Sequence, residues 1–220
     1  MKNQLIIEKL IKTLKERYGK NIKIEPSTNH EVFKLLIETI LSQRTRDENT
    51  ERAAKNLFSK ADTPEKILKL KKVELEKLIR ISGPYRQKAK RIKAVSKIIL
   101  EKYKGKIPKT REELMKLPGV GLKTSNIVFS YGYGKPVIAV DVHVEVTSKR
   151  LGLVPQNVSV KEVEDILEEL IPVEDKWVIN LGMVQFGSEI RITRKPKCYI
   201  CPLNKVCPYP NKTKPINSVN

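Results

Sequence analysis

Lys123 and Asp141 are the two residues whose types and spacing point most directly to chemistry. A neutral lysine amine can attack an electrophilic carbon and form a Schiff base. This covalent intermediate divides one difficult reaction step into two easier ones. A carboxylate nearby can assist the amine or stabilise positive charge that grows on the reacting carbon. Plainer interpretations stay open, with Lys123 as a surface lysine or phosphate contact and Asp141 as the N-cap of a helix.

The residues before Lys123 predict a tight turn that leads into a helix. In the run Leu-Pro-Gly-Val-Gly-Leu-Lys-Thr, Pro118 can set a turn, and Gly119 and Gly121 let the chain reverse without a side chain in the way. The start of the helix offers N–H groups and a partial positive charge to a phosphate. We therefore expect Gly119, Gly121 and Thr124 to hold a nucleic-acid backbone without reading its bases.

Four segments, in order along the chain, resemble the helix-hairpin-helix (HhH-GPD) DNA glycosylase superfamily, and most closely its endonuclease III family. The first two are Ile-Leu-Ser-Gln-Arg-Thr-Arg-Asp at 40–47 and Ser-Gly-Pro-Tyr-Arg-Gln-Lys-Ala at 82–89. The third is the run at 117–124 with Val-Asp-Val-His at 140–143, and the last is the cysteine-containing loop at 194–207. Together these segments span most of the chain.

The resemblance implies an enzyme in which Lys123 and Asp141 match the family's catalytic lysine and aspartate. It implies a base-excision-repair DNA glycosylase with AP-lyase (β-elimination) activity, which removes oxidised pyrimidines from duplex DNA through a lysine Schiff base. Two alternatives stay open. One is a monofunctional glycosylase for alkylated purines or mismatched bases, and the other is a non-enzymatic helix-hairpin-helix protein that only binds DNA.

The same resemblance assigns further side chains to DNA. A base inside a duplex must be turned out before it can be attacked, and the space that it leaves must be filled. Gln43 and Arg44 lie in the first DNA-facing loop, where Arg44 replaces the family's inserted glutamine, and Pro84 stands where the family has an apolar wedge. Lys88 is expected to contact a phosphate, together with Lys90, Arg91 and Lys93 on the same helix. The plainer alternatives are an ordinary turn at Pro84 and a solvated helix face at Lys88.

The three cysteines match only part of the family's cluster site. Cys198, Cys201 and Cys207 have the spacing of its last three ligands for a [4Fe–4S] cluster, but Arg191 stands where the first cysteine is expected. Such a cluster takes four thiolates. Three outcomes stay open: a cluster with another fourth ligand, loss of the cluster with the thiols as small buried residues, or a zinc ion.

Apolar residues recur at helical spacing in nearly every long segment, so we expect an all-α fold. The stripes lie at 5–14, 32–40, 75–79, 92–99 and 160–170. Thr63 and Thr110 have the pattern of N-caps followed by acidic residues, and 138–140 could form a short isolated strand. The resemblance implies a six-helix domain with the hairpin at 25–136, a domain of 1–24 and 137–220 with the cysteine loop, and a DNA groove between them.

The charge of the chain favours a polyanionic partner. Lys and Arg number 44 against 25 Asp and Glu, a formal net charge of +19 over 220 residues. The plainer interpretation is a lysine-rich surface of a heat-adapted protein. We find no apolar run long enough to span a membrane and no signal-peptide core. We expect a cytoplasmic, nucleoid-associated monomer that binds double-stranded DNA with a damaged base or an abasic site.

Overall fold

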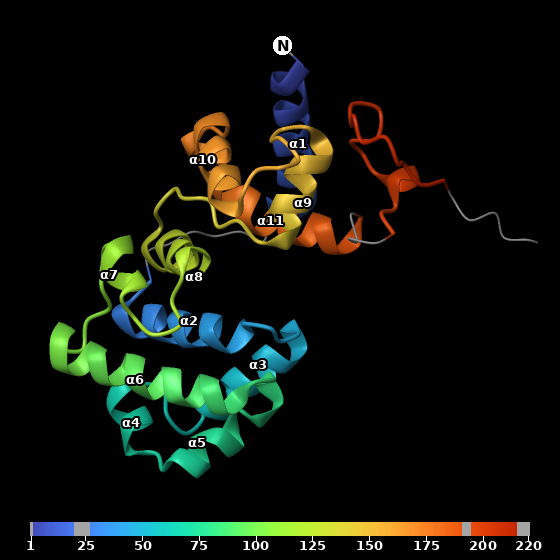
Figure 1. The fold of residues 1–220 in the computed structure, drawn as a ribbon. Helices are drawn as coiled ribbons and strands as arrows, with labels where there is room; N and C mark the ends of the chain where they lie inside the picture. Colours follow the sequence, from blue (N-terminus) through green and yellow to red (C-terminus); the bar gives the residue numbers. More distant parts are fainter. Residues whose placement is uncertain (1, 20–26, 191–194, 215–220) are drawn as a thin grey trace, which may run out of the picture. The chain divides into compact units, whose positions relative to one another are not determined.

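The computed structural model describes residues 2–19, 27–190 and 195–214 and divides into two compact units. One unit is Glu25–Lys135, and the other combines Met1–Ile24 with Pro136–Asn220. Every regular element within the described residues is a helix (Figure 1), so the predicted all-α fold is confirmed. None of the described helices is long and apolar enough to cross a membrane.

The unit Glu25–Lys135 is built around the long helix α6 (Tyr85–Tyr103), with α2 (Asn29–Ser42) along one side and α4 (Pro64–Lys69) along the other (Figure 1). The side chains between them, such as Ile40 and Ile92, have no exposed surface. The remaining elements are α3 (Asp47–Phe58), α5 (Lys72–Leu78), the 3₁₀ turn η2 (Arg80–Ser82), α7 (Arg111–Met115), α8 (Leu122–Ile127) and the π-helix η3 (Val128–Gly132).

The two predicted N-caps of this unit are confirmed. The Thr63 hydroxyl accepts from the backbone N–H of Lys66, and the Thr110 hydroxyl accepts from that of Glu113. Each cap satisfies an N–H that has no partner inside its helix. These caps explain why α4 and α7 begin where the sequence predicts.

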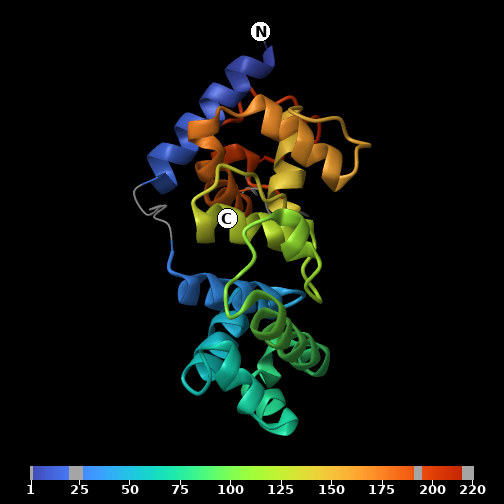
Figure 2. The ribbon, with the colours of Figure 1, turned by 90° about the vertical axis from the view of Figure 1, so that its left-hand side faces the viewer.

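The other unit holds α1 (Lys2–Tyr18), α9 (Val142–Leu151), α10 (Val160–Leu170), η4 (Val173–Asp175), α11 (Lys176–Glu189) and η5 (Cys198–Ile200). Helix α11 packs against both α1 and α9, and Figure 2 shows all three within this unit. A Cβ at Gly182 would lie 3.1 Å from Cβ of Leu14, so the glycine lets α1 and α11 approach closely.

Residues 138–140 are not the short strand that the sequence allowed; the described residues contain none. Side chains rather than a neighbouring strand satisfy this backbone. The N–H of Ile138 donates to Glu168 (2.5 Å), and the N–H of Ala139 donates to Oδ1 of Asn180 (2.8 Å). These bonds fix the path of the chain just before Asp141.

Candidate functional site

The hairpin turn that precedes α8 depends on Gly119. Its φ of +82° lies in the left-handed region, and a Cβ built there would lie 2.7 Å from Cδ of Arg91. Gly121 differs, because its backbone is extended and a Cβ would meet nothing within 4 Å. Gly119 is therefore required by conformation and packing, whereas Gly121 leaves open space at the start of α8.

Lys123 lies in the first turn of α8 with its side chain exposed. The neighbouring Thr124 is buried, with 5% of its surface exposed. The predicted contact of Thr124 with a phosphate could therefore involve its backbone N–H more readily than its hydroxyl. Lys123 belongs to the unit Glu25–Lys135.

Asp141 is the N-cap of α9, which was the plainer interpretation of this residue. Its Oδ1 accepts from the backbone N–H groups of His143 and Val144, both at 2.9 Å, and the side chain is half-buried. These two bonds satisfy N–H groups that have no partner inside the helix. The cap therefore fixes the orientation of the carboxylate. Asp141 belongs to the other unit.

Gln43 bonds within the protein, although the sequence predicts that it contacts DNA. Its Nε2 donates to the carbonyl oxygen of Gly119 (2.7 Å), and its Oε1 accepts from Nη1 of Arg91 (3.1 Å). The carboxamide thus links the loop after α2 to the hairpin and to α6. A contact between Gln43 and DNA would have to replace at least one of these bonds.

Arg44 adopts a left-handed backbone conformation with φ of +53°. This conformation is unfavourable for a residue with a side chain, and it persists when the surroundings impose it. Gly83, in the loop before α6, has φ of +76°, and its Cβ would lie 3.3 Å from the carbonyl oxygen of Arg44. The two predicted DNA-facing loops therefore touch through their backbones.

The ammonium group of Lys88, which the sequence predicts to contact a phosphate, faces inward. The residue is 1% exposed, and the group donates to the carbonyl oxygens of Leu41 and Ser82 and to the hydroxyl of Thr45. Burial, and then the charge of Arg91, lowers the pKa of Lys88 to about 8. In this geometry the ammonium group donates its hydrogens to protein oxygens and not to a phosphate.

A cationic pocket of about 450 Å³ lies between the two loops and α6. Three of the six residues that line it are cationic and none is anionic, although the ammonium group of Lys88 is turned toward protein oxygens: Gln43, Arg44, Pro84, Gln87, Lys88 and Arg91. Such a lining suits an anion or the polar edge of a base. The sequence-predicted Arg44 and Pro84 are thus brought to one pocket.

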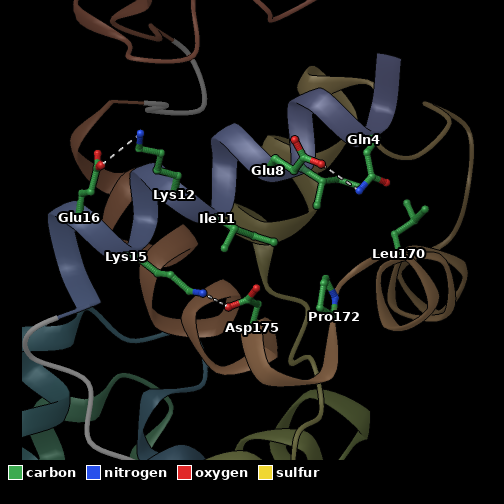
Figure 3. Close-up of a pocket in the computed structure, with 10 residues that line it drawn as sticks. Gln4, Glu8, Ile11, Lys12, Lys15, Glu16, Leu170, Pro172 and Asp175 are labelled. Atoms are coloured by element: carbon green, nitrogen blue, oxygen red, sulfur yellow. Dashed lines mark hydrogen bonds and ion pairs between the residues drawn. The ribbon is translucent and has the colours of Figure 1, made fainter. Parts of the chain in front are cut away.

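A second pocket, of about 370 Å³, lies in the other unit between α1 and residues 170–175 (Figure 3). Its lining includes Ile11 and Pro172, and the ion pair between Lys15 and Asp175 closes one side. None of the site residues predicted from the sequence lines it. This pocket is therefore not part of the candidate site.

Two of the three cysteines in the cysteine loop are buried, whereas Cys198 is half-buried. Cys201 and Cys207 are buried in the core of their unit, and Sγ of Cys207 donates to the carbonyl oxygen of Arg150 at 3.5 Å. Within the described residues, no group of three or more His, Cys, Asp or Glu side chains is arranged to hold a metal ion. Arg191 lies outside those residues. The described thiols therefore do not fit the ligand set of a [4Fe–4S] cluster.

Sequence reasoning placed Arg91 among the helix cations that could contact phosphates but did not foresee its bond to Gln43, and it missed Thr45. Arg91 stands three residues after Lys88, so both cations share one face of α6. Thr45 lies in the first loop and bonds both to Lys88 and to the carbonyl oxygen of Ser82. The spacing along α6 was the available signal, but nothing local indicates that this face is turned inward.

Comparison with known proteins now identifies the class. Residues 37–173 match the family model of the HhH-GPD superfamily base excision DNA repair protein. The chain is 46% identical over 205 residues to endonuclease III of Thermotoga maritima, which covers 93% of each chain. The protein therefore belongs to the HhH-GPD superfamily. Within that superfamily it is a homologue of endonuclease III.

Solved structures agree with this assignment. A trapped covalent intermediate of endonuclease III with DNA has a TM-score of 0.85 and 37% identity, over 94% of this chain and 96% of that chain. A thermostable thymine-DNA glycosylase has a TM-score of 0.82 and 26% identity, also over 94% and 96%. The chain therefore has the fold of both an endonuclease III and a thymine-DNA glycosylase.

Proposed function

We propose that the protein is a DNA glycosylase and AP lyase of base excision repair that acts on oxidised pyrimidines in duplex DNA. The observation that carries the proposal is its 46% identity with an endonuclease III over nearly the full length of both chains. The exposed Lys123 in the first turn of α8 and the capped Asp141 support it, because they supply the amine and the carboxylate that the reaction needs.

In this proposal Lys123 is the nucleophile. Its amine forms a bond to C1′ of the deoxyribose as the bond from C1′ to the base breaks, which gives a Schiff base after the sugar ring opens. Loss of a proton from C2′ then expels the 3′ phosphate and cuts the strand. The carboxylate of Asp141 stabilises the positive charge that grows on the sugar as the base departs.

The DNA-facing part of the proposal rests on the unit Glu25–Lys135. Arg44 and Pro84 border one cationic pocket. From this position their side chains can enter the duplex and fill the space that an extruded base leaves there. Backbone N–H groups at Gly119, Gly121 and Thr124 contact the phosphates, and the charge of +19 draws the chain to DNA. We expect the enzyme to act as a monomer at the nucleoid in the cytoplasm.

The test is borohydride trapping on four duplexes: one with an oxidised pyrimidine, one with a preformed abasic site, one with a G·T mismatch and one undamaged. We expect a covalent adduct and strand cleavage on the first two only. Base release from the mismatch without any adduct would instead support the monofunctional alternative. Binding without either product would support the non-enzymatic one.

For the cysteine loop we propose that Cys201 and Cys207 serve as small buried residues, and that neither they nor the half-buried Cys198 are cluster ligands. The burial of Cys201 and Cys207 among apolar side chains supports this. We expect the purified protein to hold far less than one iron or zinc per chain and to keep its melting temperature after treatment with a chelator. Stoichiometric iron, a brown colour and a fall in melting temperature on chelation would contradict it.

A further inference from the structure

The buried ammonium group of Lys88 holds together two segments that are distant in sequence. It donates to Leu41 at the C-terminal end of α2 (2.5 Å), to Thr45 in the loop that follows (2.6 Å), and to Ser82 at the end of η2 (2.6 Å). An ammonium group has three hydrogens, so its bonding capacity is met within the protein.

The oxygens that receive these bonds suit a cation. The carbonyl of Leu41 is among the last of α2, where helix carbonyls lack internal partners and carry partial negative charge. The carbonyl of Ser82 also accepts from the hydroxyl of Thr45 at 2.7 Å. Lys88, Thr45 and the two carbonyl groups therefore form a connected polar network. Removing the amine would leave the buried oxygens of this network without their charged donor.

The network lies beside the point where the two loops are most constrained. Arg44 and Gly83 both have positive φ, and their backbones are in contact there. A left-handed arginine is kept only where its surroundings impose that conformation. Lys88 bonds to residues on both sides of Arg44 along the chain, at Leu41 and Thr45, and so contributes to that constraint.

We propose that Lys88 is a positioning residue that fixes the loop 42–46 against the loop 82–85, so that Arg44 and Pro84 meet DNA at a set separation. The inference rests on the proposed function, since it assigns these loops to DNA. Lys88 acts through protein oxygens and contributes no phosphate contact of its own. It therefore affects the discrimination of damaged DNA and leaves the general electrostatic attraction unchanged.

The salt dependence of binding separates positioning from phosphate contact. A lysine that contacts a phosphate adds about one unit to the slope of log K against log salt, whereas a positioning residue adds none. We would measure the affinity of Lys88→Met for a duplex with an uncleavable abasic analogue and for an undamaged duplex over a range of salt concentrations. Methionine keeps the length and the apolar stem of the side chain.

The expected result is a fall of at least about tenfold in the ratio of the two affinities, at an unchanged salt slope, since small misplacements of site groups have large effects. An unchanged ratio would overturn the proposal, and so would a slope that falls by about one. Lys97→Met is the matched control, because it removes an exposed lysine from the same helix. An equal loss of ratio in this control would also overturn the proposal, since charge alone would then explain it.

Thr45→Val keeps the proposal testable if Lys88→Met does not fold. Valine has the shape of threonine but removes one oxygen from the network. The ratio of the affinities for the abasic-analogue and undamaged duplexes should therefore fall several-fold, again at a constant salt slope. An unchanged ratio would overturn the proposal. The wild type is measured first. If it neither discriminates the abasic analogue nor forms a borohydride adduct, the proposed function fails and this inference with it. If wild-type discrimination survives in both variants, only the inference fails.

Discussion

Replacing Lys123 by alanine abolishes the borohydride adduct and lowers strand cleavage at an abasic site by about 10³-fold or more, if the amine forms the Schiff base. Such a loss corresponds to roughly 4 kcal/mol of transition-state stabilisation. Lys123 lies exposed in the first turn of a helix, and the alanine side chain fits the same backbone, so folding should be unaffected. Single-turnover cleavage and trapping on a preformed abasic duplex measure the effect.

Lys116→Ala is the matched control for this prediction. Lys116 is also exposed, follows α7 just before the hairpin, and carries the same charge. We expect the control to trap and cleave at the wild-type rate within about twofold, since general attraction to DNA changes equally in both variants. An adduct that persists in Lys123→Ala would show that another amine is the nucleophile.

Local interactions explain which parts of the fold the sequence could predict. The N-caps at Thr63, Thr110 and Asp141 each bond to N–H groups two or three residues ahead, so the pattern that makes the bond is visible in a short window. Helical periodicity is equally local, and it predicted the all-α fold. The short strand that the sequence allowed at 138–140 does not form, and the partners of its N–H groups lie on α10 and α11, outside any such window.

Long-range polar bonds explain what the sequence could not predict. A lysine at position 88 of a basic helix is typical of a solvated face, and its burial depends on oxygens at Leu41 and Thr45, more than forty residues away. Gln43 is similar, since its partners Gly119 and Arg91 lie 76 and 48 residues away. Residue types and family spacing directed attention to these loops, but three-dimensional contacts decide which of their side chains bond within the protein.

The second large effect is expected from Asp141→Asn. Asparagine is as good an N-cap as aspartate, so α9 and the stability of the fold should be kept. The negative charge is lost, and with it the stabilisation of positive charge on the sugar as the base departs. We expect base excision to fall by about 10²-fold or more, measured in single-turnover assays on the oxidised-pyrimidine duplex.

Binding provides the internal check on this prediction. Affinity for the uncleavable abasic analogue should hold or rise in Asp141→Asn, since a negative charge near the phosphates is removed. Asp141→Ala separates the cap from the chemistry, because it also removes the acceptor for two N–H groups and should lower the free energy of unfolding by about 1 kcal/mol. If Asp141→Asn loses stability and DNA affinity as much as excision, the carboxylate acts only through the helix cap. A stable variant that binds abasic DNA but no longer releases the base shows that the charge itself acts on the reacting sugar.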